Sequence, residues 1–250
     1  MKHCDPAHAT IYLEKLQELV RTSHWEELRR ELRAADGALT PEQLAPAAVL
    51  ALQAGLPALA ADWAQQAGET QIQAAALLRS GDTAAALALL PGNDHRSRAM
   101  QARAQLLAGN AAQALELASQ AHEAAFEAGD APVLIAVIAL LGELELRGAL
   151  ESGSRTGLFA ALNVLAEGLK LSEILRDPAD PHVLALIALT QQQIKEGPKA
   201  QATAAKALER SLAFSPAGVL ALTVLGRHEE AQGQAEAGAL ADGWWTWAKA

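Results

Sequence analysis

Apolar side chains recur at helical spacing along almost the whole chain. The clearest case is residues 110–128, where polar side chains form one stripe at steps of three and four residues and apolar side chains form the opposite stripe. Because one to five residues separate most of the apolar stripes, we expect neighbouring helices to run antiparallel. The pattern predicts helices near residues 6–21, 24–35, 41–54, 57–67, 69–79, 82–90, 94–108, 110–128, 132–147, 155–176, 181–196, 198–213, 216–225 and 227–241.

Proline follows a capping residue at four of the expected helix starts. These are Asp5-Pro6, Thr40-Pro41, Asp180-Pro181 and Ser215-Pro216. Proline suits the first helical position because its missing N–H would have had no partner within the helix. Pro46 would lie inside a helix that begins at Thr40, so the sequence leaves open whether that helix begins there or near Ala45.

The longest apolar run extends from Val133 to Gly142. It is shorter than the roughly 20 residues that a membrane-spanning helix needs, so no span is expected. Its residues up to Leu141 are apolar on every side, which predicts a fully buried helix. The chain reaches Glu14 and Glu18 before any stretch that resembles a signal peptide, and it has one cysteine, so we expect a cytoplasmic protein.

Composition favours an all-α fold. The 250 residues include 59 alanines and 41 leucines, whereas aromatic residues make up 4%. Alanine and leucine head the helix propensity scale, while strands favour β-branched and aromatic side chains. A formal net charge of −9 opposes contact with phosphate backbones, so nucleic acid is not an expected partner.

A small residue, usually glycine, recurs five positions before an alanine or leucine that begins a new apolar stripe. Glycine allows a helix to end in the left-handed conformation, and a small residue one turn into the next helix lets two helices approach closely. Each instance predicts a helical hairpin, and their repetition favours stacked hairpins over a globular bundle. The instances are Ser23 with Leu28, Gly55 with Ala60, Gly81 with Ala86, Gly109 with Ala114, Gly197 with Ala202, Gly226 with Ala231 and, less clearly, Gly153 with Leu158.

These hairpin signals resemble the tetratricopeptide repeat family. The best match is Leu106-Leu107-Ala108-Gly109-Asn110 followed by Ala114-Leu115 and Ala121, which is similar to that family's turn and the small positions of its second helix. The turns around Gly81 and Gly226 are similar. The resemblance covers residues 23–241, more weakly between 130 and 196. The chain departs from the family's period of about 34 residues and lacks most of its aromatic packing residues.

The resemblance implies a right-handed superhelix whose concave surface binds a partner protein or peptide, without catalysis or a cofactor. We therefore expect an all-α stack of antiparallel hairpins in one domain over residues 1–250. A candidate hinge lies near residues 91–95, and a tryptophan-rich tail covers residues 243–250. The longer helices beyond residue 130 look similar to the helical-repeat sensor regions of large bacterial transcription activators.

A cationic stretch stands out in this acidic chain. Between His95 and Leu115 no acidic residue occurs, yet three arginines do: Arg96, Arg98 and Arg103. In the repeat family the first helices line the groove, so these arginines would hold carboxylates of an acidic partner segment. The alternative, which the pattern favours, is a solvated surface that pairs with Glu123 or Glu127.

Three of the five tryptophans lie within the last seven residues: Trp244, Trp245 and Trp247. A helical stack exposes an apolar end, so the simplest interpretation is that this segment folds back to cover it. The alternative is a docking or self-association element, because tryptophan is enriched at binding hot spots. Only Lys249 supplies positive charge nearby, so we expect no membrane-surface role.

Catalytic and metal-binding patterns are scarce. His3, Cys4, Asp5 and His8 are potential metal ligands, but no other ligand spacing occurs, and a helix cap explains them better. Phosphate loops, nucleophile elbows and dinucleotide motifs are absent from the sequence. Acidic side chains fall on outer stripes, and His182 and the other later histidines are expected at the surface. We therefore expect neither a metal site nor an enzyme.

The favoured interpretation is a non-catalytic interaction scaffold or regulatory module. Its partner-binding residues would be the three arginines together with Trp244, Trp245 and Trp247. One alternative is a peptide or small-ligand sensor domain of a bacterial signalling or transcription-regulatory system, with a pocket between the central apolar helices. Another is an enzyme whose site is assembled across helices in the groove.

Overall fold

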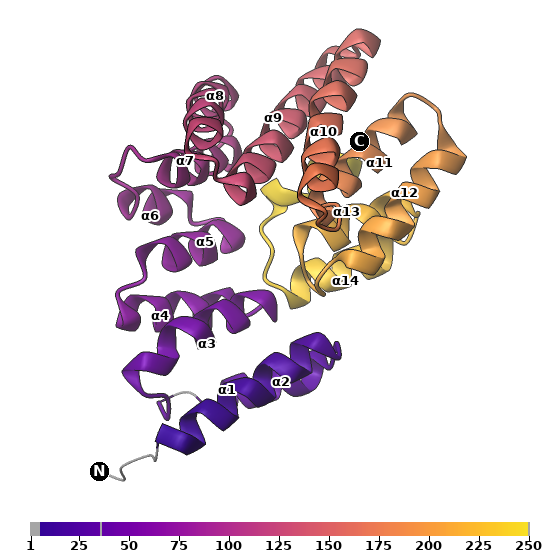
Figure 1. Ribbon diagram of the computed structural model, residues 1–250. Coiled ribbons are helices and arrows are strands. Elements are labelled where there is room, and N and C mark those ends of the chain that lie inside the picture. Colours follow the sequence, from indigo (N-terminus) through magenta and orange to yellow (C-terminus); the bar gives the residue numbers. More distant parts are fainter. Residues whose placement is uncertain (1–5, 36, 250) are drawn as a thin grey trace.

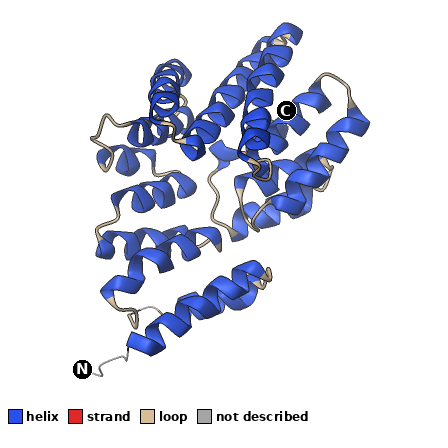
Figure 2. Ribbon diagram, in the orientation of Figure 1, coloured by secondary structure: helices blue, strands red, loops and turns tan. Residues whose placement is uncertain are grey.

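The computed structural model describes residues 6–35 and 37–249, with side chains from Tyr12 onward, and all regular structure in these ranges is helical (Figure 2). The all-α prediction is thereby confirmed. Two short 3₁₀ helices, η1 (Asp242–Trp244) and η2 (Thr246–Lys249), follow the α-helices. The α-helices are α1 (Pro6–Arg21), α2 (Trp25–Ala34), α3 (Pro41–Gln53), α4 (Pro57–Ala67), α5 (Thr70–Ser80), α6 (Thr83–Ala88), α7 (His95–Leu107), α8 (Ala111–Ala128), α9 (Ala131–Ser152), α10 (Arg155–Leu175), α11 (Pro181–Gln193), α12 (Gly197–Arg210), α13 (Pro216–Val224) and α14 (His228–Ala237).

The described helices form seven hairpins, from α1–α2 to α13–α14, and the same turn closes each of them. One residue of the turn has a positive φ, and the N–H of the next residue donates to the carbonyl five positions earlier at 2.8–2.9 Å. This is the Schellman pattern of a helix C-terminus. The left-handed residues are Ser23, Gly55, Gly81, Gly109, Gly153, Lys195 and Gly226. One local unit thus recurs along the chain.

The predicted turn at Gly197 lies two residues earlier in the structure. Lys195 has the positive φ of 67°, and Gly197 is the first residue of α12. The buried small residue five positions after the turn is accordingly Ala200, whereas Ala202 is exposed. The five-residue spacing between the turn and the buried small residue therefore holds. The turn was predicted at the wrong residue because a residue other than glycine can also adopt the left-handed conformation, at a cost of about 1–2 kcal/mol, where the flanking helices fix the turn.

Three helix boundaries refine the sequence prediction. Helix α3 begins at Pro41 and contains Pro46, and the N–H of Thr40 donates to Gln43 Oε1 at 2.8 Å in a capping box. Helix α9 continues beyond its expected end to Ser152, and α14 already ends at Ala237. The candidate hinge near residues 91–95 lies in the loop between α6 and α7 and stays a prediction.

The apolar core is a series of clusters along the stack. Separate clusters lie among α1–α5, among α5–α7, among α7–α9 and from α9 to the C-terminus. Fully buried stretches occur in α11 and α13, at residues 183–190 and 217–224. The apolar run up to Leu141 was expected to be buried on every side, but it is only partly buried, because Ala136 in α9 is exposed. No helix in the described ranges combines the length and apolarity needed to cross a membrane.

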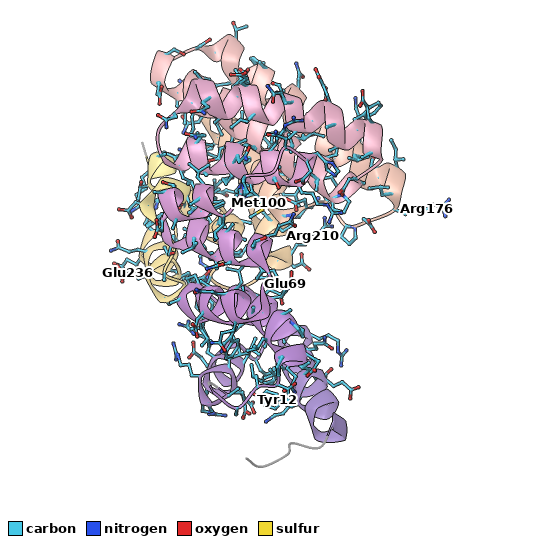
Figure 3. All side chains as sticks on the ribbon, turned by 90° about the vertical axis from the view of Figure 1, so that its left-hand side faces the viewer. Tyr12, Glu69, Met100, Arg176, Arg210 and Glu236 are labelled. Carbon is cyan, nitrogen blue, oxygen red and sulfur yellow. The ribbon has the colours of Figure 1, made fainter. Side chains whose placement is uncertain are left out.

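The hairpins follow one another around an arc, and the chain after α14 returns into its interior (Figure 1). Helices α1–α8 form one side, α9 and α10 the top, and α11–α14 the other side. The side view shows the first helices one above another, with Tyr12 near the lower end and Met100 about halfway up (Figure 3). We call residues 238–249 the C-terminal segment. It lies between the two sides, where the N–H of Ala241 donates to the Arg79 carbonyl at 2.9 Å.

Two hairpin turns approach the C-terminal part of the chain so closely that only glycine fits. A Cβ at Gly55 would lie 2.9 Å from the Cα of Gly238, and a Cβ at Gly81 would lie 2.8 Å from the Cβ of Ala241. Gly109 has nearly the same φ as Gly81, but its Cβ would meet open space. Gly81 therefore permits both its own helix turn and the close approach of Ala241.

We expect Gly81→Ala to destabilise the protein more than Gly109→Ala. Both changes place a Cβ at positive φ, which costs about 1 kcal/mol. Only the change at position 81 also displaces Ala241. In urea denaturation Gly81→Ala should show the larger loss in the free energy of unfolding, and its native tryptophan emission should shift to the red. Equal losses with unchanged emission would contradict the close packing at Ala241.

Candidate binding site

Four arginine side chains reach from the inside of the arc to the C-terminal part of the chain. They are Arg29 of α2, Arg79 of α5, Arg103 of α7 and Arg147 of α9, and we call them the inner arginines. Each contacts a main-chain carbonyl or an aromatic ring there. The arginines come from four of the first five hairpins, with none from α3–α4.

The first two inner arginines bind the region around Phe214, in the loop between α12 and α13. Arg29 Nη2 donates to the carbonyl of Ala237 at 2.8 Å, and its guanidinium carbon lies 4.6 Å from the centroid of the Phe214 ring. Arg79 Nη2 donates to the carbonyl of Phe214. Neither arginine forms an ion pair with a described residue. Both therefore use main-chain oxygens instead of carboxylates.

The other two inner arginines hold the tryptophan segment. The guanidinium carbon of Arg103 lies 4.9 Å from the centroid of the Trp244 ring, and that of Arg147 lies 4.4 Å from the centroid of the Trp247 ring. Arg147 Nη2 also donates to the carbonyl of Gly243 at 2.6 Å. Cation–π contacts of this kind are worth about 0.5–2 kcal/mol each, more where water is excluded.

A single carboxylate, that of Glu143 in α9, pairs with inner arginines in the described part of the chain. Glu143 is 1% exposed. Its Oε1 accepts a hydrogen bond from Arg147 Nη2 at 2.5 Å, and its Oε2 accepts one from Arg103 Nη1. His182 Nε2 lies 3.5 Å from Oε2. The cluster thus joins α7, α9 and the first turn of α11 beneath the C-terminal segment.

The pKa shifts follow from burial and charge. Burial by itself raises the pKa of Glu143, but Arg103, His182 and Arg147 outweigh this effect and hold it well below its ordinary value of 4.5. Burial lowers the pKa of Arg79 to about 10, so this side chain remains protonated at neutral pH. Burial also lowers the pKa of Arg147, although Glu143 opposes the shift. At neutral pH the Glu143 anion therefore lies between two arginine cations, those of Arg103 and Arg147.

Several buried donors of this region have no partner. Among the described residues, the buried side-chain nitrogens without a hydrogen bond all belong to inner arginines, to His182 or to the C-terminal segment. A buried donor that finds no acceptor costs about 1–3 kcal/mol. The segment therefore leaves much of the hydrogen-bonding capacity of this surface unused. The atoms are Nε of Arg29, Arg79 and Arg147, both ring nitrogens of His182, and Nε1 of Trp245 and Trp247.

The three tryptophans of the tail contact their own chain. Trp244 Nε1 donates to the carbonyl of Leu78 at 2.9 Å, and its ring packs against both the α5–α7 cluster and the C-terminal cluster. Trp245 is 4% exposed, and Lys249 Nζ lies 4.0 Å from the centroid of its ring. The tail folds back as expected, but it covers the inside of the arc and not an end of the stack. Self-association through these rings stays a prediction.

The structure separates the three arginines that the sequence grouped together. Arg103 belongs to the inner arginines. Arg96 is exposed, and its Nε donates to Asp130 Oδ2 at 2.7 Å. Arg98 is half-buried and forms no ion pair with any described residue. Their role in binding a partner stays a prediction.

The expected pairing of this stretch with the next helix is wrong. Arg103 pairs with Glu143 and Arg96 with Asp130, not with Glu123 or Glu127 of α8. Both actual partners lie on α9 or at its N-terminal cap, because the two hairpins pack so that α7 contacts α9. Two helices joined in one hairpin therefore need not form ion pairs with each other.

Sequence reasoning missed Glu143, Arg147 and His182. Acidic side chains were expected on solvated stripes and His182 at the surface, but Glu143 is buried and both ring nitrogens of His182 are buried. One signal was available. Glu143 and Arg147 are an acid and a base four residues apart on an otherwise apolar helix, the spacing of a stabilising pair. For His182 the sequence carries no comparable signal.

The metal-ligand group at the start of the chain cannot be placed. His3, Cys4 and Asp5 lie outside the described residues, as does the side chain of His8. Within the described part of the chain, no group of three or more histidine, cysteine or acidic side chains is arranged to hold a metal ion.

A pocket of about 310 Å³ lies beside the Glu143 cluster. Apolar side chains of α5, α7 and α9 form most of its wall, including Leu78, Met100 and Leu140. Arg103, Asp180 and His182 supply its polar side, and Trp244 of the C-terminal segment forms part of its wall. The inside of the arc therefore combines a segment-binding surface with a small apolar pocket.

No protein-family model matches this chain, and a search of curated proteins finds no relative. The functional interpretation therefore comes from the contacts described above.

We expect Glu143→Gln to lower the free energy of unfolding by about 3–5 kcal/mol. The change keeps the shape of the side chain but leaves Arg103 and Arg147 buried without their counter-charge. Glu145→Gln, two residues away on the exposed side of α9, is the matched control and should stay within about 0.5 kcal/mol of the wild type. Urea denaturation measures both. A Glu143→Gln loss no larger than the control's would show that the cluster contributes nothing to stability.

The stability difference between the wild type and Glu143→Gln should depend on pH. Because the folded protein lowers the pKa of Glu143, the stabilisation is fully present above its ordinary value of 4.5. It is lost as pH falls below that value, since the unfolded chain then binds a proton that the folded chain resists. Denaturation midpoints at pH 7, 5, 4 and 3 should therefore converge. A difference that stays constant over this range would contradict the lowered pKa.

Proposed function

We propose that the protein is a tetratricopeptide-like superhelical module that binds an extended segment of a partner protein on the inside of its arc. The architectural part of this proposal is supported by the recurring turn with a left-handed residue, which closes each of the seven described hairpins and also joins α4 to α5 and α8 to α9. Stacked units of this kind leave a continuous inner surface, and such surfaces commonly bind peptides and proteins.

The observation that carries the proposal is the C-terminal segment itself. The inside of the arc binds this segment through Arg147 to the Gly243 carbonyl, through the Arg79 carbonyl to the Ala241 N–H, and through rings stacked on arginines. Main-chain hydrogen bonds and aromatic anchors are the contacts by which proteins recognise extended peptides. A partner segment would use the same contacts after displacing the C-terminal segment.

The chemistry of the surface favours an acidic, aromatic partner. Two inner arginines share one carboxylate, and the other two have only carbonyl acceptors. A carboxylate can accept two parallel N–H bonds from one guanidinium and also carries the opposite charge, which a main-chain carbonyl does not. Carboxylates of a partner would also meet the unpaired Nε atoms of Arg29, Arg79 and Arg147. Aspartate or glutamate residues between aromatic ones would therefore compete well with the segment.

Displacement has a defined cost. The C-terminal segment is tethered to α14, so its effective concentration at the surface is of the order of millimolar. A partner segment must overcome this advantage with additional contacts. Binding of a free peptide to the wild type should consequently be weak, and it should strengthen when the docking of the segment is weakened.

We expect a labelled peptide of alternating tryptophan and aspartate to bind the double variant Trp244→Ala/Trp247→Ala at least tenfold more tightly than it binds the wild type. The substitutions remove the rings that stack on Arg103 and Arg147 and so release the surface. Fluorescence anisotropy measures the binding, and circular dichroism verifies that the helices remain.

Two controls make the result specific. Phe126→Ala removes an aromatic ring that is 71% exposed on α8, and it should leave peptide affinity unchanged. A peptide of alternating tryptophan and lysine should bind at least tenfold more weakly than the aspartate peptide. Equal affinity for the two peptides, or no gain from releasing the segment, would refute the inner surface as a site for acidic partners.

A further inference from the structure

The pocket of about 310 Å³ beside the Glu143 cluster has features of a small-molecule site, and it shares Arg103 and Trp244 with the surface that binds the C-terminal segment. Its volume falls at the lower end of the range for such sites. Its wall is mainly apolar and includes Met100 of α7, Leu140 of α9 and the Trp244 indole. A cavity of this volume, lined by apolar side chains and an indole ring, accommodates a small, flat, apolar body.

The polar side of the pocket contains donors that the protein does not use. Arg103 Nη1 donates to Glu143, and no described residue accepts from its Nε or Nη2. Both ring nitrogens of His182 are buried without a hydrogen bond, although Nε2 lies 3.5 Å from Glu143. Nδ1 of His182 is buried without a partner, and the free edge of Arg103 makes no hydrogen bond to a described residue, so one acceptor in the pocket would satisfy both.

Charge and geometry identify the acceptor. The free edge of a guanidinium presents two parallel N–H groups, which match the two oxygens of a carboxylate. Glu143 already accepts from Arg103 Nη1 and from Arg147 Nη2, and it accepts nothing from Arg103 Nε or Nη2. Asp180 also lines the pocket, but its Oδ1 accepts from the N–H groups of His182 and Val183 at the N-terminus of α11, which stabilises its negative charge.

We propose that this pocket binds a small, flat, apolar molecule that carries one carboxylate. The apolar body lies between Met100, Leu140 and the Trp244 ring, and the carboxylate accepts hydrogen bonds from the free edge of Arg103 and from His182. Because Trp244 forms one side, the pocket is complete only while the C-terminal segment is docked. The inference does not rest on partner binding, and either can fail alone.

Three ligands of equal size test this assignment on the full-length protein: naphthalene-2-carboxylate, its amide and naphthalen-2-ylmethylamine. Isothermal titration calorimetry should show saturable binding of the carboxylate, at least tenfold tighter than of the amide and tighter still than of the amine. Tighter binding of the amine would assign the polar side to Asp180 and overturn the proposal. No saturable binding of the carboxylate at about 1 mM would overturn it as well.

Substitutions then locate the binding. Ala75→Phe fills the pocket from α5 without touching the ionic cluster and should abolish carboxylate binding. Its matched control, Ala112→Phe, adds the same ring to a separate pocket between α8, α9 and α10 and should change nothing. Carboxylate binding that survives Ala75→Phe would place it elsewhere and refute the proposal.

A conservative change tests the arginine edge without removing the positive charge that Glu143 needs. Arg103→Lys keeps a cation beside Glu143 but loses the second pair of N–H groups. It should weaken carboxylate binding at least tenfold and leave amide binding within about twofold. Arg98→Lys on the same helix is the control and should leave both affinities unchanged. Equal effects of Arg103→Lys on the two ligands would contradict the role of the edge.

Discussion

The closed arrangement depends on four arginine side chains that obtain partners from the C-terminal part of the chain. Arg103 and Arg147 contact Glu143, whereas Arg29 and Arg79 form no ion pair with a described residue and have only main-chain acceptors. Removing a guanidinium from water costs several kcal/mol unless it gains hydrogen bonds in return. The carbonyls and rings of the C-terminal part of the chain supply these contacts. Without the C-terminal segment, Arg103 and Arg147 would lose the Trp244 and Trp247 rings that stack on them.

The need of the inner arginines for partners also connects the repeated turns to the proposed function. Each hairpin turn ends a helix in the left-handed conformation, and four of the first five hairpins carry an arginine that contacts the C-terminal part of the chain. Where the segment crosses the turns at Gly55 and Gly81, no side chain fits, and the glycines serve two purposes at once. The segment satisfies the surface only in part, because several arginine and tryptophan nitrogens stay unpaired. A surface that is covered by a segment, but keeps donors without hydrogen bonds, is suited to exchange that segment for another.

The sequence predicted the local structure well because the signals of helices and turns are local. Stripe spacing located the helices, and glycine spacing located most turns, with Lys195 in place of Gly197 as the exception. The site was harder to predict because its members meet across distant positions. Arg79 binds Phe214, and Arg147 binds Gly243, contacts that no local pattern encodes. Glu143 differed, because its position four residues before Arg147 on a mainly apolar helix indicated an ion pair.

Hydrogen exchange of the C-terminal segment tests the central claim most directly. The N–H of Ala241 bonds across the arc to the Arg79 carbonyl, while the N–H groups of Trp244, Trp245 and Ala248 bond within the segment. If the segment docks on the inner arginines, these four amides should exchange as slowly as those of the adjacent helix α7, and Arg147→Ala should accelerate all of them together. Exchange of the segment at the rate of an unstructured peptide in the wild type would contradict the closed arrangement.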